Sequence, residues 1–187
     1  MKLWLPIAAG ALAAGVGDLI YANIHFPMLN PANTPVSILQ SIASGWIGGK
    51  AASEGGMATA ALGAVTEFIL TGIMASVYVI AAQWITDLRK FWWVLGPCYG
   101  VVVMVVMYSV VLPLAANHGG PNLPDGGLIL ANCTVSKSGK VSPGACTGTD
   151  HQLLYGTILV HVIVIGLFIS AAARFLWPAQ KAGQALA

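Results

Sequence analysis

The run from Gly56 to Ile85 constrains this chain most, because it is long, predominantly apolar and interrupted by a single charged residue, Glu67. A helix of about 20 apolar residues, rising ~1.5 Å per residue, is enough to cross a bilayer. An ionised, unpaired carboxylate inside such a span costs several kcal/mol. We therefore expect Glu67 to face protein, water or a proton, and the rest of the chain must supply what faces it.

The composition places most of the chain in lipid. Of 187 residues, 57% are hydrophobic and 7% are charged, whereas soluble domains carry about 25% charged residues. The net charge of +2 is too small and too scattered to bind nucleic acid. These totals predict one all-α membrane domain spanning residues 1–187, with the lipid bilayer as its principal partner.

Four apolar runs predict four transmembrane helices, at about residues 3–24, 56–85, 94–116 and 152–177. The first also resembles a signal peptide with cleavage after Ala14, but the apolar run continues to Ile24, which favours a retained helix. In the third, Gly96 and Gly100 form a small-residue surface that another helix can approach closely. Pro113 is expected to kink the end of the same helix.

An interfacial helix is predicted between the first two spans. Residues 25–35 are rich in proline and asparagine, so no regular helix is expected to continue there. Thr34 and Pro35 suit the N-cap and first position of a new helix. Apolar residues then recur at helical spacing, and Gly48 and Gly49 end the pattern: Ile38, Leu39, Ile42, Ala43 and Trp46. A re-entrant loop over residues 36–56 is the alternative.

The basic residues set the predicted orientation. Arg89, Lys90 and Arg174 flank membrane boundaries and mark the cytoplasmic side. Both termini are then cytoplasmic, and the polar loop between the third and fourth spans is periplasmic, in a bacterial inner (plasma) membrane. Cys133 and Cys146 in that outer loop predict a disulfide staple, which would contribute about 2–4 kcal/mol.

Depth predicts which side chain faces the glutamate. Counted from the outer boundary, Glu67 lies ~16 Å deep and His161 ~14 Å deep. Asp18 and Tyr108 lie shallower on the same side, and Asp18 with Tyr21 is expected to line a wet vestibule. We predict an intramembrane polar site of Glu67, His161, Asp18 and Tyr108, with a Glu67–His161 hydrogen bond. Structural pairing, a role in binding a proton or ligand, and no contact are the three alternatives.

Enzyme motifs are lacking. The sequence contains no H-E-x-x-H, G-x-S-x-G or P-loop. Haem ligation by two spans is not expected, because His25, His118 and His151 all fall at the outer boundary. Quinone-linked thiol oxidoreductases need a C-x-x-C, which the chain does not have. We therefore predict no catalytic residue, no metal site and no cofactor.

Several short motifs resemble the YagU-like family of uncharacterised bacterial inner-membrane proteins. They are Gly17-Asp18, the stretch Leu39 to Ala51, Gly55-Gly56, Gly96-Pro97-Cys98-Tyr99-Gly100, Val111-Leu112-Pro113-Leu114 and His161-x4-Gly166. The resemblance implies an inner-membrane protein of unknown biochemical activity, with an expected link to acid tolerance. It implies no catalytic residues. Where that family would have histidine in G-x-x-x-H-F, this chain has Glu67.

The sequence leaves three functional hypotheses. The first is a non-enzymatic accessory or oligomerising subunit, with a second copy or a larger membrane complex as partner. The alternative is a small transporter or channel with a proton or cation site at Glu67 and His161. The third is a membrane enzyme acting on lipid or quinone through Asp18 and His25.

Overall fold

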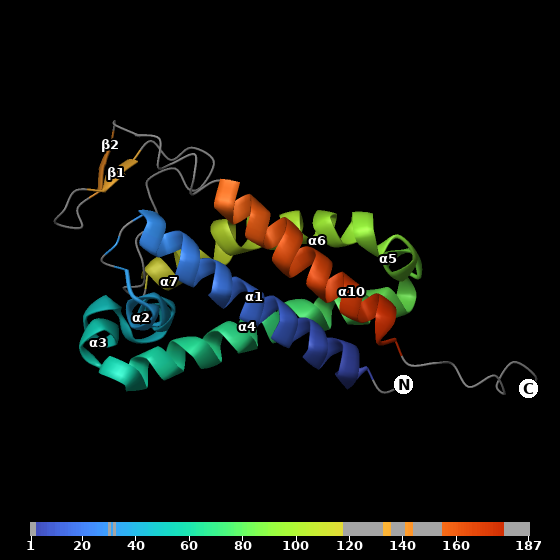
Figure 1. The fold of residues 1–187 in the computed structure, drawn as a ribbon, viewed down its shortest axis with the longest axis horizontal. Helices are drawn as coiled ribbons and strands as arrows, with labels where there is room; N and C mark the ends of the chain where they lie inside the picture. The colour runs from blue at the N-terminus through green and yellow to red at the C-terminus, as the bar shows by residue number, and fades with distance from the viewer. Residues whose placement is uncertain are drawn as a thin grey trace, which may run out of the picture.

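Four long apolar helices form the body of the molecule in the computed structural model (Figure 1), which describes residues 3–29, 31, 33–117, 133–135, 141–143 and 155–177. They are α1 (Trp4–Leu29), α4 (Gly56–Trp84), a third helix over Trp92–Ala115 and a fourth over Tyr155–Phe175. All four are long and apolar enough to cross a membrane. The predicted helical membrane architecture is confirmed at this level.

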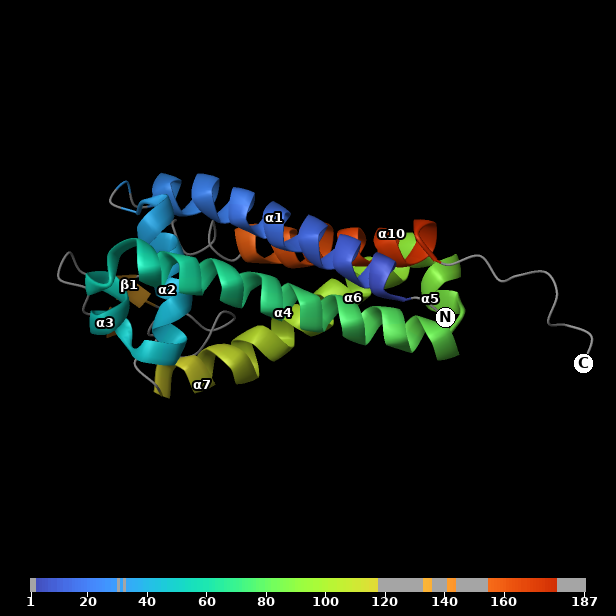
Figure 2. The same ribbon diagram turned by 90° about the horizontal axis from the view of Figure 1, so that it is seen from below.

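The four helices lie side by side along one long direction (Figures 1 and 2). α1 packs against α4 and against the fourth helix. The short helix α5 (Asp87–Lys90) lies at the end where α1 begins and the fourth helix finishes. α2 (Pro35–Ile47) and α3 (Gly49–Glu54) lie at the opposite end. We call these the α5 end and the α2 end of the bundle.

The first helix is longer than its sequence indicated. α1 continues through Pro27 to Leu29, so the prediction that no regular helix extends past Ile24 is wrong. Pro27 has no N–H and so removes only one intrahelical hydrogen bond. It lies in the last turn, where every helix has carbonyl groups without an intrahelical partner. The side-chain amide of Asn33 donates to the carbonyl of Phe26 (3.1 Å) and satisfies one of them.

The helix expected between the first two spans is confirmed. Thr34 is its N-cap: the Thr34 hydroxyl accepts from the backbone N–H of Ser37 (3.2 Å), and the Ser37 hydroxyl accepts from the N–H of Thr34 (2.8 Å). Pro35 opens it, and Gly48 ends it with φ 81°, a backbone angle that favours glycine. α2 crosses the end of the bundle instead of running along it (Figure 2).

The third and fourth helices meet through glycine. A β-carbon on Gly100 would overlap the carbonyl oxygen of His161, and one on Gly166 would overlap the carbonyl oxygen of Gly96. The predicted close approach at Gly96 and Gly100 is therefore confirmed, and its partner surface centres on Gly166 and Ser170.

Both of these helices contain π-helical turns. In the third, α6 (Trp92–Val106) passes into η1 (Met107–Val111) and then α7 (Leu112–Asn117). The N–H of Leu112 donates to the carbonyl of Met107, five residues back, directly before Pro113. Pro113 has no N–H, so a wider turn ahead of it takes the place of the predicted simple kink. In the fourth, η2 (Val160–Leu167) precedes α10 (Phe168–Phe175).

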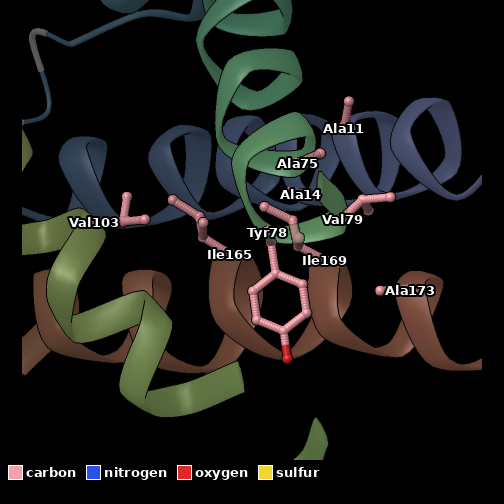
Figure 3. Packing of buried hydrophobic residues seen from close by; sticks show 9 residues of the cluster. All are labelled: Ala11, Ala14, Ala75, Tyr78, Val79, Val103, Ile165, Ile169 and Ala173. Carbon is pink, nitrogen blue, oxygen red and sulfur yellow. The ribbon is translucent and has the colours of Figure 1, made fainter. Parts of the chain in front are cut away.

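The apolar core lies in the half of the bundle nearer α5. Figure 3 shows its side chains converging from α1, α4, α6 and the fourth helix. Tyr78 fills its centre and is 1% exposed; its hydroxyl donates to the carbonyl of Leu88 (2.7 Å). The cluster is small-residue-rich, which brings the helices close: Ala11, Ala14, Ala75, Tyr78, Val79, Val103, Ile165, Ile169 and Ala173.

The loop between the third and fourth helices is described only at a two-stranded antiparallel hairpin. β1 (Cys133–Val135) pairs with β2 (Val141–Pro143), so that Cys133 is opposite Pro143. Cys146 and the side chain of Cys133 lie outside the described residues, and the disulfide between them stays a prediction. Cys98 is a free, exposed thiol.

Candidate functional site

The carboxyl groups of Asp18 and Glu67 face each other across the contact between α1 and α4. The two carboxyl groups lie within hydrogen-bonding reach of each other. Glu67 is 8% exposed, and Asp18 is half-buried. Among the residues that the structure describes, no lysine or arginine forms an ion pair with either carboxyl group. Glu67 therefore meets a second acid instead of a base.

The predicted Glu67–His161 hydrogen bond is wrong. His161 Nδ1 lies 2.9 Å from the carbonyl oxygen of Thr157, one turn earlier in its own helix. The depth estimate placed His161 near the level of Glu67, but depth does not fix which way each side chain points around its helix axis. Asp18, which was predicted in the same polar site but at a shallower depth, is the neighbour of Glu67.

Glycines in α1 bring the two acids together. A β-carbon on Gly15 would stand 2.9 Å from the ring of Phe68 and 3.0 Å from the Thr71 hydroxyl oxygen, both on α4. A β-carbon on Gly17 would likewise crowd a methyl group of Val164 in the fourth helix. Asp18 follows directly, so this glycine pair presents its carboxyl group where three helices meet.

α2 covers the carboxyl pair from the α2 end. The indole N–H of Trp46 donates to the Thr66 hydroxyl (3.0 Å), and a β-carbon on Gly63 would overlap the Leu39 carbonyl oxygen. Glu67 lies four residues beyond Gly63, or ~6 Å along the helix. The distance of ~16 Å from the start of the span therefore overstates how deep Glu67 lies below the nearest polar element.

Tyr108 and His161 form a second polar group beside the acids. The Tyr108 hydroxyl lies 3.2 Å from the Thr157 hydroxyl, and the Tyr108 and His161 rings are 6.1 Å apart. Tyr108 is also an electrostatic neighbour of Asp18. Both residues sit in π-helical turns, which are frequent at functional sites because they re-aim side chains.

Tyr21 and His25 extend the site along α1 towards the α2 end. Their rings stack at 4.9 Å with an interplanar angle of 18°. The Tyr21 hydroxyl and His25 Nε2 are buried, and neither has a hydrogen-bond partner among the described residues. Both lie against Gly156, the second residue of the fourth helix as described. Buried polar atoms without partners are uncommon and mark a place where water or a ligand binds.

The four residues predicted for an intramembrane polar site form two neighbouring pairs in the structure. Asp18 pairs with Glu67, and Tyr108 lies beside His161. Thr157 and Gly156 were missed, because a threonine and a glycine at the start of an apolar run carry no signal of their own. Tyr21 and His25 could have been added, since residues 18, 21 and 25 share one face of a helix.

The site is closed towards the α5 end by the apolar core. Ala14 lies one turn from Asp18, and Ala75 lies two turns from Glu67, and both are fully buried. No group of three or more metal-binding side chains occurs in the part of the chain that the structure describes. The arrangement suits the binding of a proton or a small polar species on the side of the core nearer α2.

No protein-family model, curated protein or solved structure matches this chain. Its function must therefore be argued from the geometry of this site.

Proposed function

We propose that the chain is a small membrane transporter that takes up a proton at the Asp18–Glu67 carboxyl pair. The observation that carries the proposal is the close approach of these two carboxyl groups, neither of which is paired with a positive side chain among the described residues. A hydrogen bond between two carboxyl groups exists only when one of them holds a proton. If both were ionised, their repulsion in a low-dielectric site would be on the order of a few kcal/mol or more.

A proton suits this site better than a metal cation. A cation needs several oxygen ligands, and the neighbouring hydroxyls are already engaged. Thr66 accepts from Trp46 and donates to the Leu62 carbonyl (2.8 Å), and Thr71 donates to the Glu67 carbonyl (3.0 Å). We place the proton on Glu67, the more deeply buried of the two acids.

The closed core favours a carrier over an open channel. Tyr78 and the alanines around it fill the bundle towards α5, so we infer that a proton reaches the carboxyl pair from the α2 end. Passage of a proton to the other side then requires movement of the helices. The glycine contacts between helices provide surfaces on which such sliding is possible.

Reconstituted vesicles test the proposal. An imposed pH gradient should drive proton movement that Glu67→Gln and Asp18→Asn each abolish. Glu54→Gln is the matched control, because Glu54 is an exposed glutamate in α3, away from the pair. Wild-type flux in Glu67→Gln would overturn the proposal, as would the absence of flux from the wild-type protein at every pH.

A bacterial inner-membrane location is part of the same proposal, with the α5 end and both termini cytoplasmic and the α2 end periplasmic. Arg89, Lys90 and Arg174 at the α5 end support it through the positive-inside rule. A Cys133–Cys146 disulfide would suit a periplasmic loop. The YagU-like resemblance is compatible with this location.

A non-enzymatic accessory or oligomerising subunit is the second candidate. The observation that favours it is the third helix, whose most apolar window is only 11% buried within the chain. Lipid or a partner helix must cover the rest. Native mass spectrometry from several detergents should give one defined oligomer in this case, and a strict monomer would count against it.

A further inference from the structure

We propose that Tyr21 and His25, held against Gly156, form a water-bridged proton relay that leads from the α2 end to the Asp18–Glu67 pair. The inference rests on the proposed function and deepens it by naming the entry path. Its basis is a pair of buried polar atoms that lack partners among the described residues, located beside a glycine.

The two atoms are close enough for one water molecule to bridge them. The Tyr21 hydroxyl oxygen and His25 Nε2 both lie within 2.8 Å of the point where a β-carbon on Gly156 would stand. The two atoms are therefore less than about 6 Å apart, a gap that a single bridging water spans with two ordinary hydrogen bonds. The water would form a hydrogen bond with the Tyr21 hydroxyl and with His25 Nε2. Without a partner, each of these buried atoms would carry the full free-energy cost of its removal from solvent.

The order of residues along α1 gives the path its direction. His25 is nearest the α2 end, Tyr21 lies one turn further in, and Asp18 lies a turn beyond Tyr21 on the same face. Tyr21 is an electrostatic neighbour of both Asp18 and Tyr108. A proton from outside binds His25 Nδ1, and His25 donates the proton on its Nε2 to the water. The water passes a proton to the Tyr21 oxygen, and Tyr21 releases its own proton to the acid pair.

Each relay group gains one proton and loses one, so only the carboxyl pair changes its charge. The titratable neighbours of Tyr21 are Asp18 on α1 and Tyr108 on the third helix, and Tyr155 directly precedes Gly156 in the fourth. α2 contributes none, since residues 35–47 contain no acidic, basic or histidine side chain. The relay should therefore affect how fast the pair exchanges its proton and leave the equilibrium protonation of the pair unchanged.

Two substitutions interrupt the relay at different points. Gly156→Ala adds a methyl group that would overlap the Tyr21 hydroxyl and so displace it from the bridge, and Tyr21→Phe removes the hydroxyl that passes the proton on. Gly72→Ala is the matched control, because Gly72 is a helical glycine in a span with nothing within 4 Å of the added methyl. Folding of each variant is checked by its carboxyl infrared band and its unfolding temperature.

The test measures initial proton uptake into vesicles after a pH step. We expect Gly156→Ala and Tyr21→Phe each to slow uptake on the order of 100-fold, while Gly72→Ala keeps the wild-type rate. Wild-type rates in both relay variants, with uptake still abolished in Glu67→Gln, would overturn the relay alone. Wild-type uptake in Glu67→Gln would overturn the proposed function itself.

Discussion

Two acids that share a proton make stability depend on pH in a definite direction. On the proposed shared proton, folding brings Asp18 against Glu67 around one proton that the separated acids of the unfolded chain would not hold between them. Stability should therefore fall as the pH rises and the proton is lost. An acid held by a salt bridge has the opposite effect, because the folded protein then loses stability as the pH falls.

We predict that the wild-type unfolding temperature in detergent decreases between neutral and alkaline pH, and that Glu67→Gln removes most of this decrease. The glutamine amide still donates to Asp18 but carries no titratable proton. Differential scanning fluorimetry across a pH series measures the effect, with Glu54→Gln as the control. A parallel pH profile in Glu67→Gln and wild type would contradict the shared proton.

The bond between Trp46 and Thr66 should contribute little by itself. Trp46 is 66% exposed, so loss of its N–H donor costs about 0.5–1.5 kcal/mol. Trp46→Phe and Thr66→Val should each lower the free energy of unfolding by about that amount, and the double variant should cost no more than either. Fully additive losses in this double-mutant cycle would show that the bond is absent.

Among helices and loops, the sequence predicted the positions of elements better than their contacts. Hydrophobic runs mark spans, and Thr34, Pro35 and Gly48 mark the ends of α2, because these signals are local. The pairing of Glu67 with Asp18 depends on how α1 and α4 are rotated and how closely Gly15 lets them approach. Because α1 and α4 are apolar on nearly every face, their sequences do not indicate which face of each helix turns towards the other.

The docking of α2 should depend on Gly63. A β-carbon there would overlap the backbone carbonyl of Leu39, which cannot rotate away as a side chain can. Gly63→Ala should therefore cost about 1–3 kcal/mol and change the fluorescence of Trp46, since α2 must shift. Gly72→Ala is again the control, and equal stability in the two variants would contradict the packing of α2 on α4.

Proline 113 should control the π-helical turn before it. Pro113→Ala restores an N–H donor, which allows η1 to revert to a regular α-helix. An α-helical turn contains one residue fewer than a π-helical turn, so this change would rotate Tyr108 away from Thr157. In the wild type the hydroxyl oxygens of Tyr108 and Thr157 are 3.2 Å apart. The tyrosine hydroxyl vibration should shift in this variant, and an unchanged spectrum would indicate that the π-turn does not depend on the proline.

On the scale of the whole molecule, the two ends of the bundle should face opposite sides of the membrane. Ser53 in α3 and Lys90 in α5 are exposed at the α2 and α5 ends. Cysteine introduced at each, with the native cysteines replaced by serine, should react with a membrane-impermeant maleimide from opposite sides. We expect Ser53→Cys to be labelled in intact cells and Lys90→Cys only after lysis. Labelling of both from one side would contradict the four-span topology.

The central claim is that Asp18 and Glu67 hold one proton between them. Infrared spectroscopy of the purified protein at neutral pH tests this directly, since a protonated carboxyl group has its own carbonyl stretching band. A shared proton predicts a band that is present in the wild type, lost in both Glu67→Gln and Asp18→Asn, and retained in Glu54→Gln. The absence of such a band from the wild type, or its persistence in Glu67→Gln, would contradict the claim.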